Sequence, residues 1–275
     1  MKNVVLSVSM LLALLGTELR AEVKVAKDVA YGPHQRNVLD VYWKSNFKNA
    51  PIVFTIHGGG FRNGSKAYCN AAMQKLYLDK GCVVVSPNYR LIGDGKPTKI
   101  ADCEIDCAMA VAYIQANAAK YGGDPARILS TGSSAGGYLS ARIAYRKSWD
   151  WPAGAKHKPK KLNIVGWYGD SPFLPSYAIK SVAAKDPPGF IIYGEHEHRA
   201  TPASQGHDMR AALKAKGVWN AMVYVAGARH VPGRRALIVP QTRNKAAYTA
   251  YDRFLDMVLF SKAPPEDGTL IKIGR

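Results

Sequence analysis

The stretch Gly132–Gly137, with the sequence G-S-S-A-G-G, follows the apolar run 128–131 and precedes a segment with a helical pattern. Glycines two positions before and after Ser134 let a strand and a helix approach closely, which pushes the serine hydroxyl out of the sheet. Ser133 is the local competitor, but Ser134 is the residue bracketed by the two glycines. A helix N-cap with no chemistry is the alternative role for such a serine. The stretch predicts a nucleophilic serine at a strand–turn–helix junction.

A second glycine-rich turn, H-G-G-G at positions 57–60, follows the apolar run Pro51–Ile56. Backbone N–H groups in such a turn can be directed at an oxygen that gains negative charge during a reaction. Each motif alone is a modest signal. Together, in this order and each after a strand-like run, they predict an oxyanion hole and its nucleophile.

Strand-like apolar runs alternate with helix-like stretches along the chain. The strand-like runs are Val23–Ala30, Val38–Trp43, Pro51–Ile56, Cys82–Ser86, Ile128–Thr131, Asn163–Trp167, Phe190–Tyr193 and Ala221–Val225. The helix-like stretches are Ala71–Lys80, Asp102–Tyr121, Ser134–Tyr145, Ala203–Lys216 and Gln241–Leu259. This alternation predicts an α/β fold with a mostly parallel central sheet and helices on both faces. Ligands of such sheets bind beyond the carboxyl ends of the strands, where both glycine motifs are expected.

The amino end has the layout of a secretory signal peptide. A short basic head at residues 1–3 precedes an apolar stretch at 4–16, and a polar tail ends in the small residue Ala21. The apolar stretch is shorter than the ~20 residues that span a bilayer, which disfavours a membrane anchor. We therefore expect a signal peptide at 1–21, cleaved near Ala21, and a single domain at 22–275 that is periplasmic or secreted. No later segment has the character of a membrane span.

The chain carries a formal net charge of +18, from 38 Lys and Arg against 20 Asp and Glu. Such a field attracts anions and is screened by salt. The basic residues are scattered, and no basic stripe with interleaved aromatics or zinc-finger spacing favours nucleic acid. A weak attraction to acidic polysaccharide is the partner that this charge allows.

The four cysteines, Cys69, Cys82, Cys103 and Cys107, permit one or two disulfides in an oxidising compartment, and the sequence does not choose the pairing. Cys103 and Cys107 lie four apart on an expected helix, a spacing more often left unbridged. Their spacing is poor for zinc, so no metal site is predicted.

Together with N-Y-R-L at 88–91 and G-D-P-A-R-I at 123–128, the glycine motifs resemble those of the α/β-hydrolase superfamily. The likeness is to bacterial carboxylesterases of the hormone-sensitive-lipase-like type, and it extends over residues 38–259. It implies an oxyanion hole formed by the N–H groups of Gly59, Gly60 and Ala135. It also implies that His57 braces the glycine loop, and that no cofactor is needed.

The resemblance implies the chain order serine, acid, histidine. His230 follows the last core strand in A-G-A-R-H, where the family places its histidine. The remaining histidines considered as the base are His34, His157, His196, His198 and His207, and surface or core positions suit them better. His230 is the predicted general base.

Three carboxylates compete for the role of the acid. Glu197 occupies the position three residues after Gly194 where the family usually carries aspartate. It is one methylene longer than aspartate, and one extra residue separates it from the next proline. Glu195 and Asp170 are the alternatives. A metal-binding interpretation of E-H-E-H at 195–198 is disfavoured, because an extended chain directs glutamates and histidines to opposite sides.

These features predict an exported serine esterase that acts on small acyl or aromatic acyl esters through an acyl-enzyme. The short stretch 168–189 predicts a fairly open site. Tyr168, Phe173 and Tyr177 are candidate pocket residues, and core or surface packing is an equal alternative for them. Small-molecule or carbohydrate-linked esters are the expected substrates. A small amidase or formamidase on the same fold is the alternative enzyme, and a non-catalytic binding module is the alternative outside enzymes.

Overall fold

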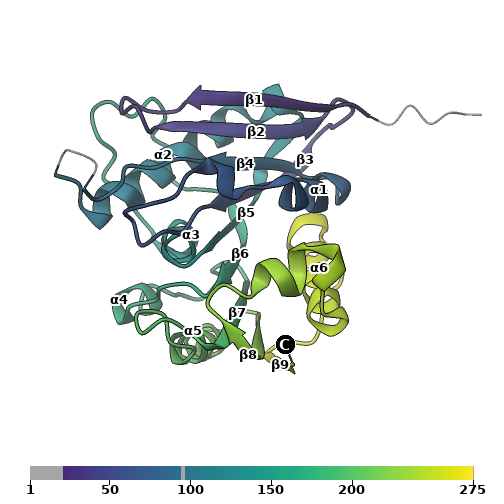
Figure 1. Cartoon of the computed structure of the whole chain (residues 1–275). Coiled ribbons are helices and arrows are strands. Elements are labelled where there is room, and N and C mark those ends of the chain that lie inside the picture. The colour runs from purple at the N-terminus through teal and green to yellow at the C-terminus, as the bar shows by residue number, and fades with distance from the viewer. Residues whose placement is uncertain (1–20, 94–96, 275) are drawn as a thin grey trace, which may run out of the picture.

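A computed structural model describes residues 21–93 and 97–274 of the chain. The predicted signal peptide lies outside these residues except for Ala21. The strands join into one sheet in the order β1-β2-β4-β3-β5-β6-β7-β8-β9 (Figure 1). Their bounds are β1 Val23–Ala30, β2 Val38–Lys44, β3 Ala50–Ile56, β4 Val83–Pro87, β5 Gly123–Ser133, β6 Ile164–Asp170, β7 Gly189–His196, β8 Asn220–Arg229 and β9 Thr269–Ile273. The pairings β1–β2 and β2–β4 are antiparallel and the others are parallel.

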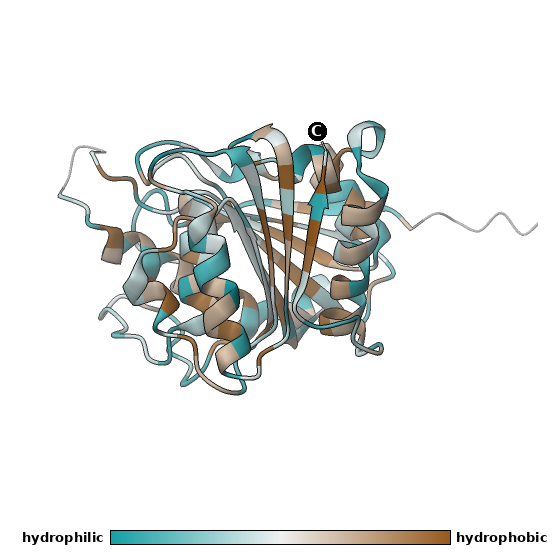
Figure 2. Ribbon diagram, turned by 90° about the horizontal axis from the view of Figure 1, so that it is seen from below, coloured by the Kyte–Doolittle hydropathy of each residue, from teal (hydrophilic) through white to brown (hydrophobic). Residues whose placement is uncertain are grey.

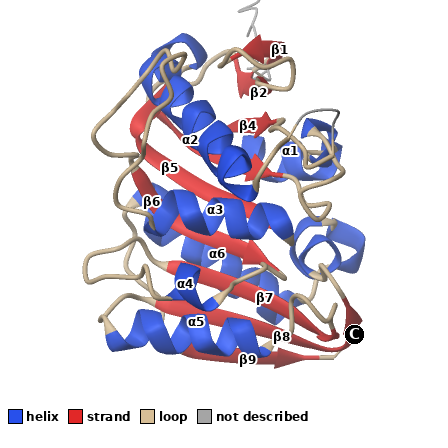
Figure 3. Ribbon diagram, turned by 90° about the vertical axis from the view of Figure 1, so that its left-hand side faces the viewer, coloured by secondary structure: helices blue, strands red, loops and turns tan. Residues whose placement is uncertain are grey.

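Helices cover both faces of the sheet. The longer ones are α1 Ala71–Asp79, α2 Ile100–Asn117, α3 Ala135–Tyr145, α5 Ser204–Ala215 and α6 Lys245–Phe260. The shorter ones are η1 Lys66–Tyr68, η2 Ala118–Tyr121, α4 Ser176–Ile179, η3 Arg234–Ile238 and η4 Pro240–Thr242. Helices α2, α3 and α5 lie in front of the sheet in Figure 3 and α6 lies behind it; α1 shares a core cluster with α6. The predicted α/β class with a mostly parallel sheet is confirmed.

The central strands are apolar because both of their faces are covered. Every residue of β3 and of β4 is buried, and hydrophobic residues follow the strands through the middle of the molecule in Figure 2. Strand β1 lies at one edge and is largely exposed. This layering brings the carboxyl ends of β3, β5, β6, β7 and β8 to one edge of the sheet.

Strand β9 lies outside the apolar runs that predict the other strands. It pairs in parallel with β8, and its residues alternate between more and less exposed positions. A short, half-exposed edge strand lacks the continuous apolar run that marks the central strands.

All four cysteines are free and buried. Burial raises the pKa of the Cys69, Cys82 and Cys103 thiols to about 12, so these groups stay protonated at neutral pH. Within residues 21–93 and 97–274, none of the helices combines the length and apolarity needed to cross a bilayer.

Candidate active site

Ser134 occupies a sharp turn between β5 and α3, with φ of 53° and ψ of −120°. The turn is tightly packed, because a Cβ on Gly132 would lie 2.3 Å from the carbonyl oxygen of Gly136. A Cβ on Gly136 would lie 2.2 Å from the carbonyl oxygen of Ile56, so neither glycine position has room for a side chain. The predicted strand–turn–helix junction therefore has the geometry that exposes a serine hydroxyl.

The glycine loop lies directly beside this turn. A Cβ on Gly58 would be 3.3 Å from the Cβ of Ser134. Gly59 and Gly60 have φ values of 103° and 60°, a backbone region that glycine adopts without steric cost. No backbone hydrogen bond among the described residues is donated by the N–H of Gly59, Gly60 or Ala135. These N–H groups are available to a ligand atom next to Ser134.

His57 supports the glycine loop from its buried side. It is 1% exposed, its Nδ1 lies 2.8 Å from the carbonyl oxygen of Gly58, and its ring stacks on Tyr89 at 4.2 Å. The Tyr89 hydroxyl donates to the carbonyl oxygen of His57 at 3.0 Å. Burial lowers the pKa of His57 to about 4, so the ring is neutral near pH 7.

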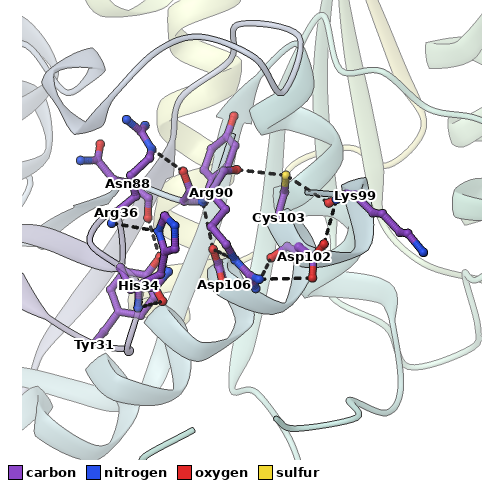
Figure 4. A network of polar contacts seen from close by, with 11 residues as sticks. Tyr31, His34, Arg36, Asn88, Arg90, Lys99, Asp102, Cys103 and Asp106 are labelled. Atoms are coloured by element: carbon purple, nitrogen blue, oxygen red, sulfur yellow. Dashed lines mark hydrogen bonds and ion pairs between the residues drawn. The ribbon is translucent and has the colours of Figure 1, made fainter. Parts of the chain in front are cut away.

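A charged network supports the same region (Figure 4). Arg90 donates from its backbone N–H, Nε and Nη2 to the carboxylate of Asp106, at 2.7–2.9 Å. Its Nη1 lies 3.3 Å from Asp102. Arg36 ties the neighbouring segment by donating to the carbonyl oxygens of Tyr89 and Gly64. The segments next to the glycine loop are thus held by an Arg90–Asp106 ion pair and by hydrogen bonds from Arg36 to main-chain oxygens.

His230 and Glu197 meet at the ends of β8 and β7. Their Nδ1 and Oε2 atoms are 2.5 Å apart, and the side chains are 19% and 3% exposed. Oε1 of Glu197 accepts from the Gly194 N–H at 2.8 Å and from the Ser171 hydroxyl at 2.5 Å. Burial opposes ionisation of Glu197, but these hydrogen bonds prevail and lower its pKa below the usual value. The carboxylate can therefore fix the His230 tautomer.

The two alternative acids lie elsewhere. Glu195 is exposed, and its Oε2 accepts from the Gly227 N–H at 2.7 Å. Asp170 is 3% exposed, and its Oδ1 accepts from the Gly233 N–H at 3.1 Å. Burial raises the pKa of Asp170 to about 8. Of the three carboxylates, Glu197 is the one that the structure places against His230.

Ser171 connects the acid to the histidine loop, and no sequence motif singled it out. Its hydroxyl donates to Glu197 and accepts from the Val231 N–H at 3.0 Å. Ser171 and Val231 both lie in the left-handed backbone region, at φ of 46° and 61°, which is costly for residues other than glycine. The preceding residue, Asp170, accepts from the Ser134 N–H through its main-chain oxygen at 2.9 Å. The end of β6 thus touches the segments that carry serine, acid and histidine.

Aromatic side chains flank Ser134 on the α3 side. Phe173, whose N–H donates to the Ser134 carbonyl oxygen at 3.2 Å, lies 6.3 Å from Phe61 between ring centroids. Tyr177 is 53% exposed nearby and hydrogen-bonds to Tyr138. Tyr168 does not join this group: it is buried on the α6 side, where its ring packs on Tyr251 at 4.8 Å. Of the two roles left open for Tyr168, pocket wall or core, the structure shows core packing, because the side chain projects from the α6 face of β6.

The order of the strands and the position of the serine turn define an α/β-hydrolase. The sequence profile of the BD-FAE family, an α/β-hydrolase family, matches residues 39–181, and the chain belongs to this family.

Known proteins share both sequence and fold with the chain. It is 34% identical to the probable carboxylic ester hydrolase LipM of Mycobacterium tuberculosis, over 42% of this chain and 27% of LipM. It is 27% identical to esterase LipQ of the same organism, over 69% of this chain and 53% of LipQ. The chain thus spans about a quarter to a half of these curated relatives. A butyrate-bound esterase of Thermogutta terrifontis has the same fold, with a TM-score of 0.71 and 22% identity over 90% of this chain and 96% of that one.

Proposed function

We propose that the protein is a serine carboxylic ester hydrolase in which Ser134 is the nucleophile, His230 the general base and Glu197 the acid. The observation that carries this proposal is the 2.5 Å contact between Glu197 and His230 at the edge of the sheet where Ser134 lies. The relatives named as ester hydrolases support it.

In this proposal Glu197 holds the proton of His230 on Nδ1 and leaves Nε2 free to accept the Ser134 proton. Ser134 attacks the ester carbonyl, and the N–H groups of Gly59, Gly60 and Ala135 stabilise the oxyanion. The protonated His230 then gives its proton to the leaving alcohol. Water repeats the sequence on the acyl-enzyme and regenerates the serine.

Small acyl groups and aromatic acyl groups suit the site better than long lipid chains. The segment between β6 and β7 contains only the one-turn helix α4, so it adds little cover over Ser134. Phe61 and Phe173 provide an apolar wall beside the nucleophile, and Phe173 remains partly exposed. The butyrate in the Thermogutta terrifontis esterase agrees with a short acyl group. Small-molecule and carbohydrate-linked esters are both compatible with this opening.

Hydrolysis of p-nitrophenyl acetate, butyrate and palmitate, and of p-nitroacetanilide, tests the proposal. We expect cleavage of the short esters, weak cleavage of the palmitate and little cleavage of the anilide. Ser134→Ala should reduce kcat by ~10⁴ or more, while Ser133→Ala, the matched control, keeps far more activity. Retained activity in Ser134→Ala would overturn the assignment, and faster anilide than ester cleavage would favour the amidase.

Covalent labelling gives a second measurement of the nucleophile. Treatment with paraoxon should add one diethylphosphoryl group, and peptide mass spectrometry should locate it on Ser134. A label on Ser133, or no label in an active enzyme, contradicts the proposal.

We further propose that the protein acts outside the cytoplasm, after removal of residues 1–21. The layout of the amino end supports this location. Sequencing the amino terminus of protein recovered from an exporting bacterial host tests it, and a start at Glu22 is the expected result. An intact Met1 in cell-associated protein would argue against export.

A further inference from the structure

A pocket of about 460 Å³ opens beside His230, at the carboxyl ends of β8 and β9. Its volume lies within the ~300–1,000 Å³ range of small-molecule sites. His230 forms part of its wall. The other lining residues come from the carboxyl-terminal half of β8 and the loop after it, from η3, from the segment before α6 and from the end of β9. The mechanism proposed above uses none of them.

Three arginines line this pocket, and the wall contains no acidic residue. Arg243 donates hydrogen bonds to the carbonyl oxygens of Leu237 and Ile238, and its guanidinium group lies over the Tyr248 ring. Arg229 and Arg235 are exposed, and within the described ranges neither guanidinium group forms an ion pair or a hydrogen bond; Arg235 accepts from the Thr242 hydroxyl through its main-chain oxygen. Two guanidinium groups are thus left for a ligand.

Among the described residues, neither nearby acid forms an ion pair with these arginines. Glu197 is held by His230, and Glu195 by the Gly227 N–H. Asn244 lines the pocket and is the N-cap of α6, so the positive end of this 16-residue helix adds to the field. The pocket is therefore positive on several sides.

The remainder of the wall is apolar. It is formed by Val225, Ala228, Val231, Pro232, Ala236 and Ile273. A pocket with an apolar wall and unpaired guanidinium groups suits an organic body that carries a carboxylate or a phosphate. Arginine is suited to both groups because its planar fork can donate two parallel hydrogen bonds.

We propose that this pocket binds an anionic group on the leaving alcohol of the ester. This inference rests on the proposed function and adds the substrate class: esters whose alcohol bears a carboxylate or phosphate. Three strand spacings separate the ends of β5 and β8, or about 14 Å at the usual spacing. An alcohol that reaches from Ser134 toward the pocket must therefore be extended, with an aromatic ring or sugar unit between ester and anion. Because His230 donates its proton to the alcohol, the leaving group lies on the His230 side.

Two matched esters test this inference. The first is 4-acetoxycinnamate, which carries a carboxylate on the leaving phenol, and the second is its neutral amide. We expect the wild type to favour the carboxylate by about tenfold in kcat/KM, mainly through KM. The combined Arg229→Gln and Arg235→Gln variant should remove most of this preference. Lys156→Gln with Lys158→Gln, which removes equal charge from an exposed loop, should keep it.

Direct binding separates this inference from the proposed function. Isothermal titration of Ser134→Ala with 4-hydroxycinnamate and with phenyl phosphate should show binding that weakens when Arg229 and Arg235 are replaced. The phosphate and carboxylate arms identify the preferred anion. Cleavage of both esters at equal rates contradicts the anion subsite but not the proposed esterase function. If neither ester is cleaved, the proposed function fails, and absence of binding at millimolar concentration overturns the subsite as well.

Discussion

The two sides of the candidate site hold their buried aspartates in opposite ways. Below the glycine loop, Asp106 is fully buried and receives three hydrogen bonds from Arg90. Below the histidine loop, Asp170 is 3% exposed and faces backbone N–H groups, with no cation paired to it in the described part of the chain. The first carboxyl is matched by a charge. The second is not, and its pKa is raised to about 8 by burial.

This difference between Asp106 and Asp170 indicates that the glycine loop has a rigid support, whereas the acid and the histidine lie in a region with backbone strain. The glycine loop needs fixed N–H directions, and an arginine–carboxylate network supplies a stiff base for them. On the other side, Ser171 after β6 and Val231 in the histidine loop lie in the left-handed backbone region, next to the short contact between the Glu197 carboxylate and the His230 ring. Strain of this kind persists where surrounding contacts impose it, and it commonly marks working parts of a site.

Replacing Glu197 and Glu195 one at a time should have the largest effect and should sharpen this contrast. Glu197→Ala should lower kcat by ~10³–10⁴, because His230 loses the group that fixes its tautomer. Glu195→Ala, the matched control on the same strand end, should cost little. Steady-state hydrolysis of p-nitrophenyl acetate measures each variant. Collapse of activity in the Glu195 variant alone would move the acid to that residue.

On the glycine-loop side, replacing the aspartates that contact Arg90 should lower the stability of the fold. Asp106→Ala leaves Arg90 without its main partner, and we expect a loss of about 3 kcal/mol in the free energy of unfolding. The Asp102 side chain is 33% exposed, lies 3.3 Å from Arg90 and accepts from the Lys99 N–H at 2.8 Å, so its replacement by alanine should cost only about 1 kcal/mol. Urea denaturation of both variants measures the difference. Equal losses would contradict the dominant role given to Asp106.

Ser171 offers a test that separates an effect on activity from an effect on stability. Ser171→Gly removes the hydroxyl between Glu197 and Val231, and we expect kcat to fall by about tenfold because the hydrogen bond to the acid is lost. Stability should be kept better than in Ser171→Ala, because glycine adopts φ of 46° without cost. Melting temperatures and kinetics of both variants provide the comparison. Full activity in the glycine variant would make the hydroxyl dispensable.

The last test is the pH dependence of stability that Asp170 imposes. The unfolded carboxyl titrates near 4, whereas the folded one keeps its proton to about pH 8, so the folded state binds more protons between these values. Stability from this group is therefore full below pH 4 and declines as pH rises toward 8. Asp170→Asn mimics the protonated acid and should flatten this decline. Melting temperature from pH 4.5 to 8 is the measurement, and parallel curves for the two proteins would refute the raised pKa.

Local patterns sufficed to predict the features formed by consecutive residues. The serine turn follows from Gly132 and Gly136, and the parallel sheet follows from the alternation of apolar runs with helical stretches. Glu197 and His230 were predicted from their places after strand-like runs and from the family pattern. The export signal and the catalytic roles stay predictions.

Contacts between residues far apart in the chain could not be predicted from the sequence. Ser171 meets Val231 across 60 positions, and Glu197 binds it across 26. The pocket beside His230 collects Arg229, Arg235 and Arg243 from three short segments, and nothing in their spacing distinguishes them from other scattered basic residues. The sequence left Tyr168 open between pocket and core, because one position along a strand reverses the face to which a side chain points.

The free cysteines have a consequence for how the protein is made. Four buried thiols in reduced form mean that the fold draws its stability from the packed sheet and needs no oxidant to form. Because their thiolate fraction is small at neutral pH, exchange with other thiols should be slow as long as the protein stays folded. The same native state is thus accessible in a reducing cytoplasm and in an oxidising compartment, and dithiothreitol should leave its melting temperature unchanged.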